Sequence, residues 1–195
     1  MLILVTGQKD SGKTTLCQRL FELAHAAGWD VAGVLSPARL QEGHKLGIEA
    51  VDLRSGRRRL LAHAREASST PAGLHTDAWT FDETVMAWGN DVLRAATPCD
   101  LLIVDELGPL EFERNRGWTD GLAAVDSGDY RHALVVVRPQ LLPAARARWP
   151  HAQVVDVSQT EQPGFPGEIA PPAGDRLFPH AAAGRGSRRR GPGAG

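Results

Sequence analysis

Residues 7–15 have the types and the spacing of a loop that binds phosphate. They contain the complete pattern G-x-x-x-x-G-K-[ST] and follow an apolar stretch of strand length. The two glycines of the pattern permit backbone angles that a Cβ atom forbids, so successive N–H groups can point at one anion. The residues of this candidate loop are Gly7, Gln8, Lys9, Asp10, Ser11, Gly12, Lys13, Thr14 and Thr15.

Two side chains of this loop predict its ligand. The Lys13 ammonium can reach the β- and γ-phosphates, and the Thr14 hydroxyl can bind Mg²⁺. A helix that begins near Lys13 adds its positive end and its unpaired N–H groups. The loop therefore predicts the binding of a nucleoside triphosphate, such as ATP or GTP, with Mg²⁺ as cofactor.

A second group of chemically competent residues follows the apolar stretch 101–104. That stretch predicts a buried strand, which delivers Asp105 and Glu106 to its carboxyl end. Asp105 can hold the water shell of the Mg²⁺ that Thr14 binds. Glu106 can orient and deprotonate an attacking water molecule. An acidic pair at this point therefore favours hydrolysis of the nucleotide over binding alone.

Arg138 is a third candidate for a catalytic role, beside Glu106 and Lys13. It follows the apolar stretch 133–137. If that strand lies between the first strand and the acidic one, Arg138 projects at the edge of the sheet where ligands bind in open α/β folds. There it could stabilise charge on the γ-phosphate. The alternative is an ordinary surface arginine at a strand end.

Glu111, Arg39 and Lys45 each leave two roles open. Glu111 follows the turn at Gly108-Pro109 and fits either a carboxylate of the site or an ordinary turn residue. Arg39 and Lys45 flank Gly43 in the polar stretch with which the predicted hairpin region begins, and they could close over the phosphates or lie in a solvated loop. The sequence does not decide between these roles.

The apolar patterns predict the scaffold that positions these residues. Strands are expected at 2–6, 31–35, 101–104, 133–137 and 154–157. Helices are expected at about 13–27, 81–96, 118–125 and 142–149. Between them, near alternation of apolar residues predicts a β-hairpin at 39–62, and 63–80 read as a mobile connector with Pro71 and Gly73. This order indicates an α/β fold, a doubly wound and mostly parallel sheet with an inserted β-hairpin.

Composition bounds the rest of the chain. We expect one domain at 1–157 and, at 158–195, a disordered tail rich in Pro, Gly and Arg. A net charge of −1 makes nucleic acid an improbable partner, and no run approaches the ~18 apolar residues of a membrane-spanning helix. The first strand begins at residue 2 and leaves no room for a signal peptide. Cys17 and Cys99 lie far apart in the sequence and form no metal-binding pattern. A buried free thiol is the expectation for Cys17, which indicates a reducing, cytoplasmic setting.

The same residues resemble a known group of proteins. The loop 7–15, the stretch 33–36 with Arg39, Gly43 and Gly47, and the string 105–111 are similar to the small P-loop nucleoside-triphosphatases of the cancer-related and thermophile type. The resemblance covers about residues 1–157. It implies a P-loop NTPase fold with a RecA-like or kinase-like core, and Mg²⁺-dependent hydrolysis of nucleoside triphosphates with loose base preference.

What the resemblance implies for individual residues matches the reasoning from their chemistry. Lys13 and Thr14 become residues of the nucleotide and metal site, and Asp105 and Glu106 become its metal-site and catalytic carboxylates. The product would be a nucleoside diphosphate and phosphate.

Two other functions stay open. A P-loop kinase for a small molecule or a nucleotide would use 39–80 for its acceptor and Glu106 as base for the acceptor hydroxyl. The loop also resembles that of the GTP-binding accessory protein of molybdopterin-guanine dinucleotide assembly, a binding module whose family is not known for the 105–111 string. The sequence indicates neither the preferred base nor the oligomeric state.

Overall fold

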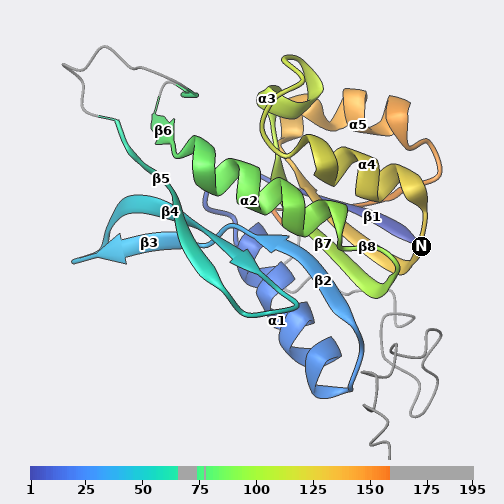
Figure 1. Cartoon of the computed structure of the whole chain (residues 1–195). Coiled ribbons are helices and arrows are strands. Elements are labelled where there is room, and N and C mark those ends of the chain that lie inside the picture. The colour runs from blue at the N-terminus through green and yellow to red at the C-terminus, as the bar shows by residue number, and fades with distance from the viewer. Residues whose placement is uncertain (66–73, 77, 159–195) are drawn as a thin grey trace, which may run out of the picture.

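A parallel sheet of five strands forms the core of the computed structural model, which describes residues 1–65, 74–76 and 78–158 (Figure 1). The five strands lie in the order β2-β7-β8-β1-β9. The first four strands of this order are mainly apolar and buried because helices cover both of their faces, whereas the edge strand β9 is partly exposed. Their bounds are β1 Leu2–Thr6, β2 Val31–Leu35, β7 Cys99–Leu107, β8 Tyr130–Val137 and β9 Gln153–Asp156.

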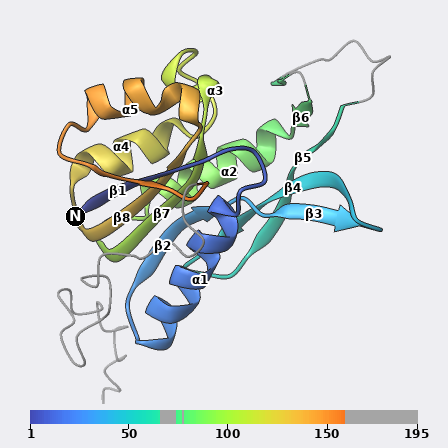
Figure 2. The ribbon, with the colours of Figure 1, turned by 180° about the vertical axis from the view of Figure 1, so that it is seen from behind.

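Helices pack on both faces of this sheet. Helix α1 covers one face alone, and α2, α4 and α5 cover the other (Figures 1 and 2). Alternation along β1 divides its side chains between the layers, with Ile3 and Val5 in the cluster of α1 and Leu2 and Leu4 in the other. The helices are α1 Lys13–Ala26, α2 Glu83–Arg94, α3 Pro109–Phe112, α4 Thr119–Ser127 and α5 Leu142–Arg148, with a 3₁₀ turn at Pro139–Leu141. The predicted α/β fold with a doubly wound sheet is confirmed.

The insertion after β2 is larger than the predicted hairpin. Four antiparallel strands extend the sheet from β2, which pairs with β4. They are β3 Ala38–Gln41, β4 His44–Asp52, β5 Arg58–Ala64 and β6 Trp79–Phe81. The polar stretch read as a loop contains β3 and a turn in which Glu42 and Gly43 have φ angles of 50° and 81°. Every residue of β3 is exposed, so an edge strand of this kind lacks the apolar alternation that would predict it.

The predicted connector at 63–80 is wrong at both of its ends. Residues 63–64 belong to β5, and residues 79–80 belong to β6. His75 forms an isolated antiparallel bridge with Thr80. Pro71 and Gly73, which prompted the prediction, lie outside the described residues.

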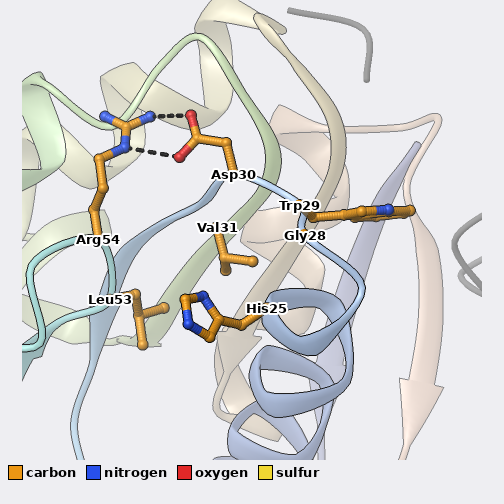
Figure 3. A pocket seen from close by; sticks show the side chains of 7 residues that line it. All are labelled: His25, Gly28, Trp29, Asp30, Val31, Leu53 and Arg54. Atoms are coloured by element: carbon orange, nitrogen blue, oxygen red, sulfur yellow. Dashed lines mark hydrogen bonds and ion pairs between the residues drawn. The ribbon is translucent and has the colours of Figure 1, made fainter. Parts of the chain in front are cut away.

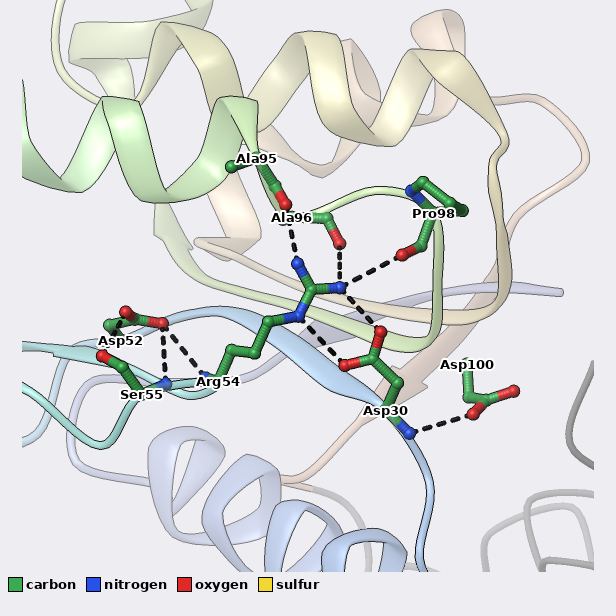
Figure 4. A network of polar contacts seen from close by, with 8 residues as sticks. All are labelled: Asp30, Asp52, Arg54, Ser55, Ala95, Ala96, Pro98 and Asp100. Carbon is green, nitrogen blue, oxygen red and sulfur yellow. Dashed lines mark hydrogen bonds and ion pairs between the residues drawn. The ribbon is translucent and has the colours of Figure 1, made fainter. Parts of the chain in front are cut away.

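One arginine fixes the insertion to the core of the fold (Figure 4). Arg54, in the turn after β4, donates to the Asp30 carboxylate from Nε at 3.0 Å and from Nη2 at 2.7 Å. Its guanidinium also donates to the main-chain oxygens of Ala95, Ala96 and Pro98, where α2 has ended. The pKa of Arg54 is raised, chiefly by the hydrogen bond with Asp30. Such a planar, bidentate contact fixes direction as well as distance, so β2, α2 and the insertion are joined at the amino edge of the parallel strands.

The last described residue is Ser158, and the rest of the tail predicted at 158–195 lies outside the described residues. Cys17 and Cys99 are both buried and free. Among the helices of the described part, none has the length and apolar character needed to cross a membrane.

Candidate active site

The loop 7–15 joins the carboxyl end of β1 to the amino end of α1, and its backbone is shaped for an anion. Gly7, Asp10 and Gly12 have φ angles of 146°, 61° and 90°, which favour glycine strongly at the first and last of these positions. The first helical hydrogen bond runs from Leu16 N to Gly12 O at 2.9 Å. The N–H groups that precede Leu16 in α1 therefore have no partner within the helix, and together with the helix dipole they could bind an anion.

Lys13 reaches back across this loop. Its Nζ donates to Gly7 O at 2.9 Å and to Gln8 O at 2.6 Å, and lies 3.4 Å from Ser11 Oγ. Burial lowers the pKa of the Lys13 ammonium, and the nearby carboxylates of Glu106 and Asp105 raise it. Since its hydrogen-bond partners are neutral, the charge of this ammonium stays available to a phosphate.

Asp105 is fully buried at the carboxyl end of β7 and faces Thr14. The Thr14 hydroxyl donates to Asp105 Oδ1 at 3.4 Å. On its other side, Asp105 Oδ2 accepts a hydrogen bond from Ser36 N at 2.9 Å, and the Ser36 hydroxyl donates to the Asp105 carbonyl at 3.3 Å. Burial raises the pKa of Asp105 to about 6, and the hydrogen bond from Ser36 opposes that shift.

This donor set fits Mg²⁺. A hydroxyl and a carboxylate oxygen are ligands of the kind that Mg²⁺ takes when substrate phosphates and water complete its shell. Burial raises the pKa of Asp105 because it disfavours the charged carboxylate, and a cation beside this carboxylate would favour the charged form and oppose that shift. Within the described residues no group of three or more His, Cys, Asp or Glu side chains could hold a metal by itself. Thr14 and Asp105 could hold Mg²⁺ together with the phosphates of a bound nucleotide and water.

Glu106 and Arg138 meet at the same edge of the sheet. The sequence placed Arg138 there only if its strand lay between β1 and β7, and β8 does. Arg138 Nη2 lies 3.2 Å from Glu106 Oε1, and both side chains are about two-fifths exposed, at 42% and 37%. Glu106 has a φ of 74°, a left-handed conformation that is rare outside glycine and concentrated at functional sites.

Glu111 lies in α3. The sequence left open whether it is a carboxylate of the site or an ordinary turn residue, and its contacts are those of a residue that stabilises the turn. Its carboxylate is buried and accepts hydrogen bonds from Gly108 N and Trp118 N, both at 2.7 Å. A Cβ atom at Gly117 would lie 1.9 Å from Glu111 Oε1, so that position requires glycine. Burial raises the pKa of Glu111 to about 7, although both hydrogen bonds lower it. Glu111 thus closes the loop that leads away from Glu106.

Replacing Glu111 with glutamine should flatten the pH dependence of stability. The pKa of Glu111 is about 7 in the folded protein against 4.5 for a free side chain. Between these values the folded protein keeps a proton that the unfolded chain releases, so the free energy of unfolding falls as the pH rises. The fall is on the order of 3 kcal/mol at most, and Glu111→Gln should remove it. Denaturant titrations at a series of pH values measure the slope.

The matched control is Glu113→Gln, the same change at an exposed carboxylate two residues further on. It should leave the slope unchanged. Glutamine offers one acceptor oxygen to two N–H groups, so Glu111→Gln lowers stability at every pH as well. Only the slope tests the titration, and a native slope in Glu111→Gln would contradict it.

Arg39 and Lys45 belong to strands rather than to a loop. Arg39 is an exposed residue of β3, and Lys45 of β4 lies with its Nζ 5.2 Å from the centre of the Trp79 ring. Within the described residues, neither side chain forms a hydrogen bond or ion pair with the phosphate loop. Both stay outside the candidate site in this structure.

The structure also has surface pockets away from these residues. One pocket of about 280 Å³ opens at the carboxyl end of α1 and has the Asp30–Arg54 pair in its wall (Figure 3). It is lined by His25, Gly28, Trp29, Asp30, Val31, Leu53 and Arg54. Since α1 has 14 residues at a rise of about 1.5 Å each, this pocket is about 20 Å from the phosphate loop. It is separate from the candidate active site.

Sequence reasoning missed Ser36. Ser36 holds both the carboxylate and the carbonyl of Asp105, although 69 residues separate the two in the chain. A serine after a strand has no distinctive local pattern. Its role depends on the parallel pairing of β2 with β7, which sequence periodicity does not reveal.

Comparison with known proteins gives a consistent family. A family model described as NTPase matches residues 2–157. The nucleoside-triphosphatase THEP1 of Methanothermobacter thermautotrophicus is 34% identical over 113 residues, which are 58% of this chain and 63% of that protein. The chain thus spans slightly less than two-thirds of this relative. The protein of the same name from Methanosarcina barkeri is 28% identical over 172 residues, or 86% of this chain and 94% of that protein.

A solved structure has the same fold. The solution structure of a human cancer-related nucleoside triphosphatase superposes with a TM-score of 0.60 at 22% identity. The match covers 80% of this chain and 88% of that one.

Proposed function

The chain belongs to the NTPase family, and from that membership we propose that it hydrolyses nucleoside triphosphates to the diphosphate and phosphate with Mg²⁺ as cofactor. The names of the relatives, which are nucleoside-triphosphatases, support this activity. The observation that carries the proposal is the meeting of Thr14 with Asp105 at 3.4 Å. It joins the phosphate loop to the strand end that also presents Glu106.

Binding is assigned to the loop. Its N–H groups and the Lys13 ammonium take the phosphates, so that Lys13 exchanges the carbonyls of Gly7 and Gln8 for phosphate oxygens. Thr14 and Asp105 hold Mg²⁺, which neutralises charge on the phosphates when it is bound. The proposed nucleotide-binding residues are Gly7, Gln8, Lys9, Asp10, Ser11, Gly12, Lys13, Thr14 and Thr15.

Catalysis is assigned to Glu106, with help from Lys13 and Arg138. Glu106 orients water and accepts its proton as the oxygen attacks the γ-phosphorus. Arg138 lies beside Glu106 at 3.2 Å and can turn to the γ-phosphate as negative charge develops there. The pair of Arg138 and Glu106 is about two-fifths exposed and contributes only about 0–1 kcal/mol. A phosphate group can therefore displace Glu106 from Arg138 at little cost.

The NTPase domain is proposed to comprise residues 1–157, in agreement with the extent of the family match. A reducing compartment such as the cytoplasm is proposed because both cysteines are buried and free. The family match does not favour the two alternatives, a P-loop kinase and a GTP-binding accessory protein.

A turnover panel tests the proposal. ATP, GTP, CTP and UTP are each incubated with the protein and Mg²⁺, and phosphate and nucleoside diphosphate are quantified. We expect stoichiometric release of the two products without any added acceptor, and its loss when EDTA removes Mg²⁺. Turnover that appears only with an added acceptor would support a kinase instead. Tight binding of GTP without turnover would support the accessory protein.

A further inference from the structure

The chain that leaves β9 packs directly on the start of the phosphate loop. β9 pairs with β1 up to Thr6 and Asp156, and Val157 N then donates to Thr6 O at 2.9 Å. One residue later, the Ser158 hydroxyl accepts a hydrogen bond from Gln8 N at 2.8 Å. The two partners are 150 residues apart in the chain, so this contact depends on the fold.

Ser158 is itself held in place for this contact. Its N–H donates to Asp156 Oδ1 at 2.9 Å, which forms a local turn of the kind that aspartate favours. The fit on the loop is close, because a Cβ atom at Gly7 would lie 2.8 Å from both Ser158 Oγ and Val157 Cγ2. Glycine at position 7 thus leaves room for the residues that follow β9, and it also adopts the φ angle of 146° that the loop requires.

The hydrogen bonds of Gln8 show what Ser158 does. The Gln8 carbonyl accepts from Lys13 Nζ at 2.6 Å and from Ser11 N at 3.2 Å, while its N–H is taken by Ser158. A nucleotide that draws Lys13 away from this carbonyl does not remove the hydrogen bond that Gln8 N donates to the Ser158 hydroxyl. The hydroxyl is therefore a fixed anchor for the loop at the moment when the lysine moves to phosphate.

We propose that Ser158 is a positioning residue of the phosphate loop: its hydroxyl holds the Gln8 peptide so that the following N–H groups converge on a polyphosphate. Ser158 acts through the loop and needs no contact with the nucleotide. The inference deepens the proposed function, on which its kinetic part rests. Because it concerns the shape of the loop rather than the reacting groups, it predicts an effect on polyphosphate binding more than on the chemical step.

The test compares Ser158→Ala with the conservative variant Ser158→Thr, which keeps the hydroxyl at an exposed position. The dissociation constant for inorganic tripolyphosphate is measured by calorimetry, and KM and kcat are measured with a nucleoside triphosphate. Amide hydrogen exchange of Gln8 reports the hydrogen bond itself. Ser127→Ala is the matched control, because the Ser127 hydroxyl also accepts from a backbone N–H, that of Asp129, at the far end of α4.

Ser158→Ala should raise Kd and KM about five-fold, equivalent to about 1 kcal/mol, and change kcat by less than about two-fold. Exchange at Gln8 should become faster, Ser158→Thr should restore all three values, and Ser127→Ala should change none. A native Kd in Ser158→Ala would overturn the inference, as would a defect that Ser158→Thr does not restore. If the native protein hydrolyses no nucleotide, the proposed function fails, while tripolyphosphate binding and Gln8 exchange still decide the role of Ser158.

Discussion

Replacing Lys13 with alanine is expected to reduce nucleotide turnover at least ~10²-fold and to weaken nucleotide binding about ten-fold or more. The Lys13 ammonium crosses the loop and lies on the carbonyls of Gly7 and Gln8, which places its charge at the proposed phosphate site. A hydrogen bond to a charged group contributes about 1.5–3 kcal/mol, which sets the binding effect. Loss of one preformed donor to transition-state charge costs about 10²–10³ in rate, which sets the kinetic effect.

Two further variants make this result specific to Lys13. Arg19→Ala removes an exposed cation from the same helix and should leave binding and turnover unchanged. Lys13→Arg keeps the charge but replaces a compact ammonium by a planar fork, and it should recover little turnover in a loop this tight. Equilibrium binding, steady-state kinetics and a thermal melt are measured for all three. Native turnover in a folded Lys13→Ala protein would show that the loop is not the active site.

The parts of the site that could be predicted from sequence are those with a local pattern. The phosphate loop and the pair Asp105 and Glu106 each lie within a few residues of the apolar strand that presents them. Their chemistry follows from their order along the chain, so no contact between distant segments had to be known. The doubly wound sheet was predictable for the same reason, because each buried strand is a continuous apolar run.

The parts that could not be predicted depend on which strands become neighbours. Arg138 lies at the site because β8 pairs with β7 and β1, and periodicity does not determine the order of parallel strands. Ser36 and Ser158 contact the site across 69 and 150 residues. Both are single hydroxyls after a strand, a feature with no signal of its own. Glu111 is assigned to the turn rather than to the site because it is buried and bonded to main-chain N–H groups. Its burial depends on how residues 108–118 pack, which the sequence pattern does not show.

The charged groups of the candidate site are held in arrangements that a substrate can replace. Lys13 lies on neutral carbonyls, and Glu106 lies on Arg138 across a half-exposed contact. Asp105, in contrast, is buried, and among the described residues Ser36 N and the Thr14 hydroxyl donate to its carboxylate. Since a buried carboxylate is stabilised most by a nearby cation, occupation of the site should improve the environment of Asp105 more than that of Glu106. Substitutions of the two adjacent acids are therefore expected to affect different properties, Mg²⁺ dependence for Asp105 and the rate of phosphate release for Glu106.

Replacing Glu106 with glutamine should separate binding from chemistry. Glutamine keeps the shape of the side chain and an acceptor for Arg138, which lies 3.2 Å from Glu106 Oε1, but it cannot accept a proton from water. General base catalysis contributes about 10²–10⁴-fold. We therefore expect Glu106→Gln to bind a Mg²⁺-nucleotide about as tightly as the native protein and to release phosphate at least ~10²-fold more slowly. Equilibrium binding and single-turnover phosphate release measure the two effects.

Asp105→Asn is the comparison that distinguishes loss of a proton acceptor from loss of a metal ligand. It removes one charge from the adjacent position, keeps an oxygen for Ser36 N, and should mainly raise the Mg²⁺ concentration at which turnover is half-maximal. Saturating Mg²⁺ should restore part of the rate to Asp105→Asn and none to Glu106→Gln, because more cation cannot replace a proton acceptor. If Glu106→Gln releases phosphate at the native rate, Glu106 is not the base. A rate that Mg²⁺ restores in Glu106→Gln would instead make Glu106 a metal residue and would leave the activation of water to another group.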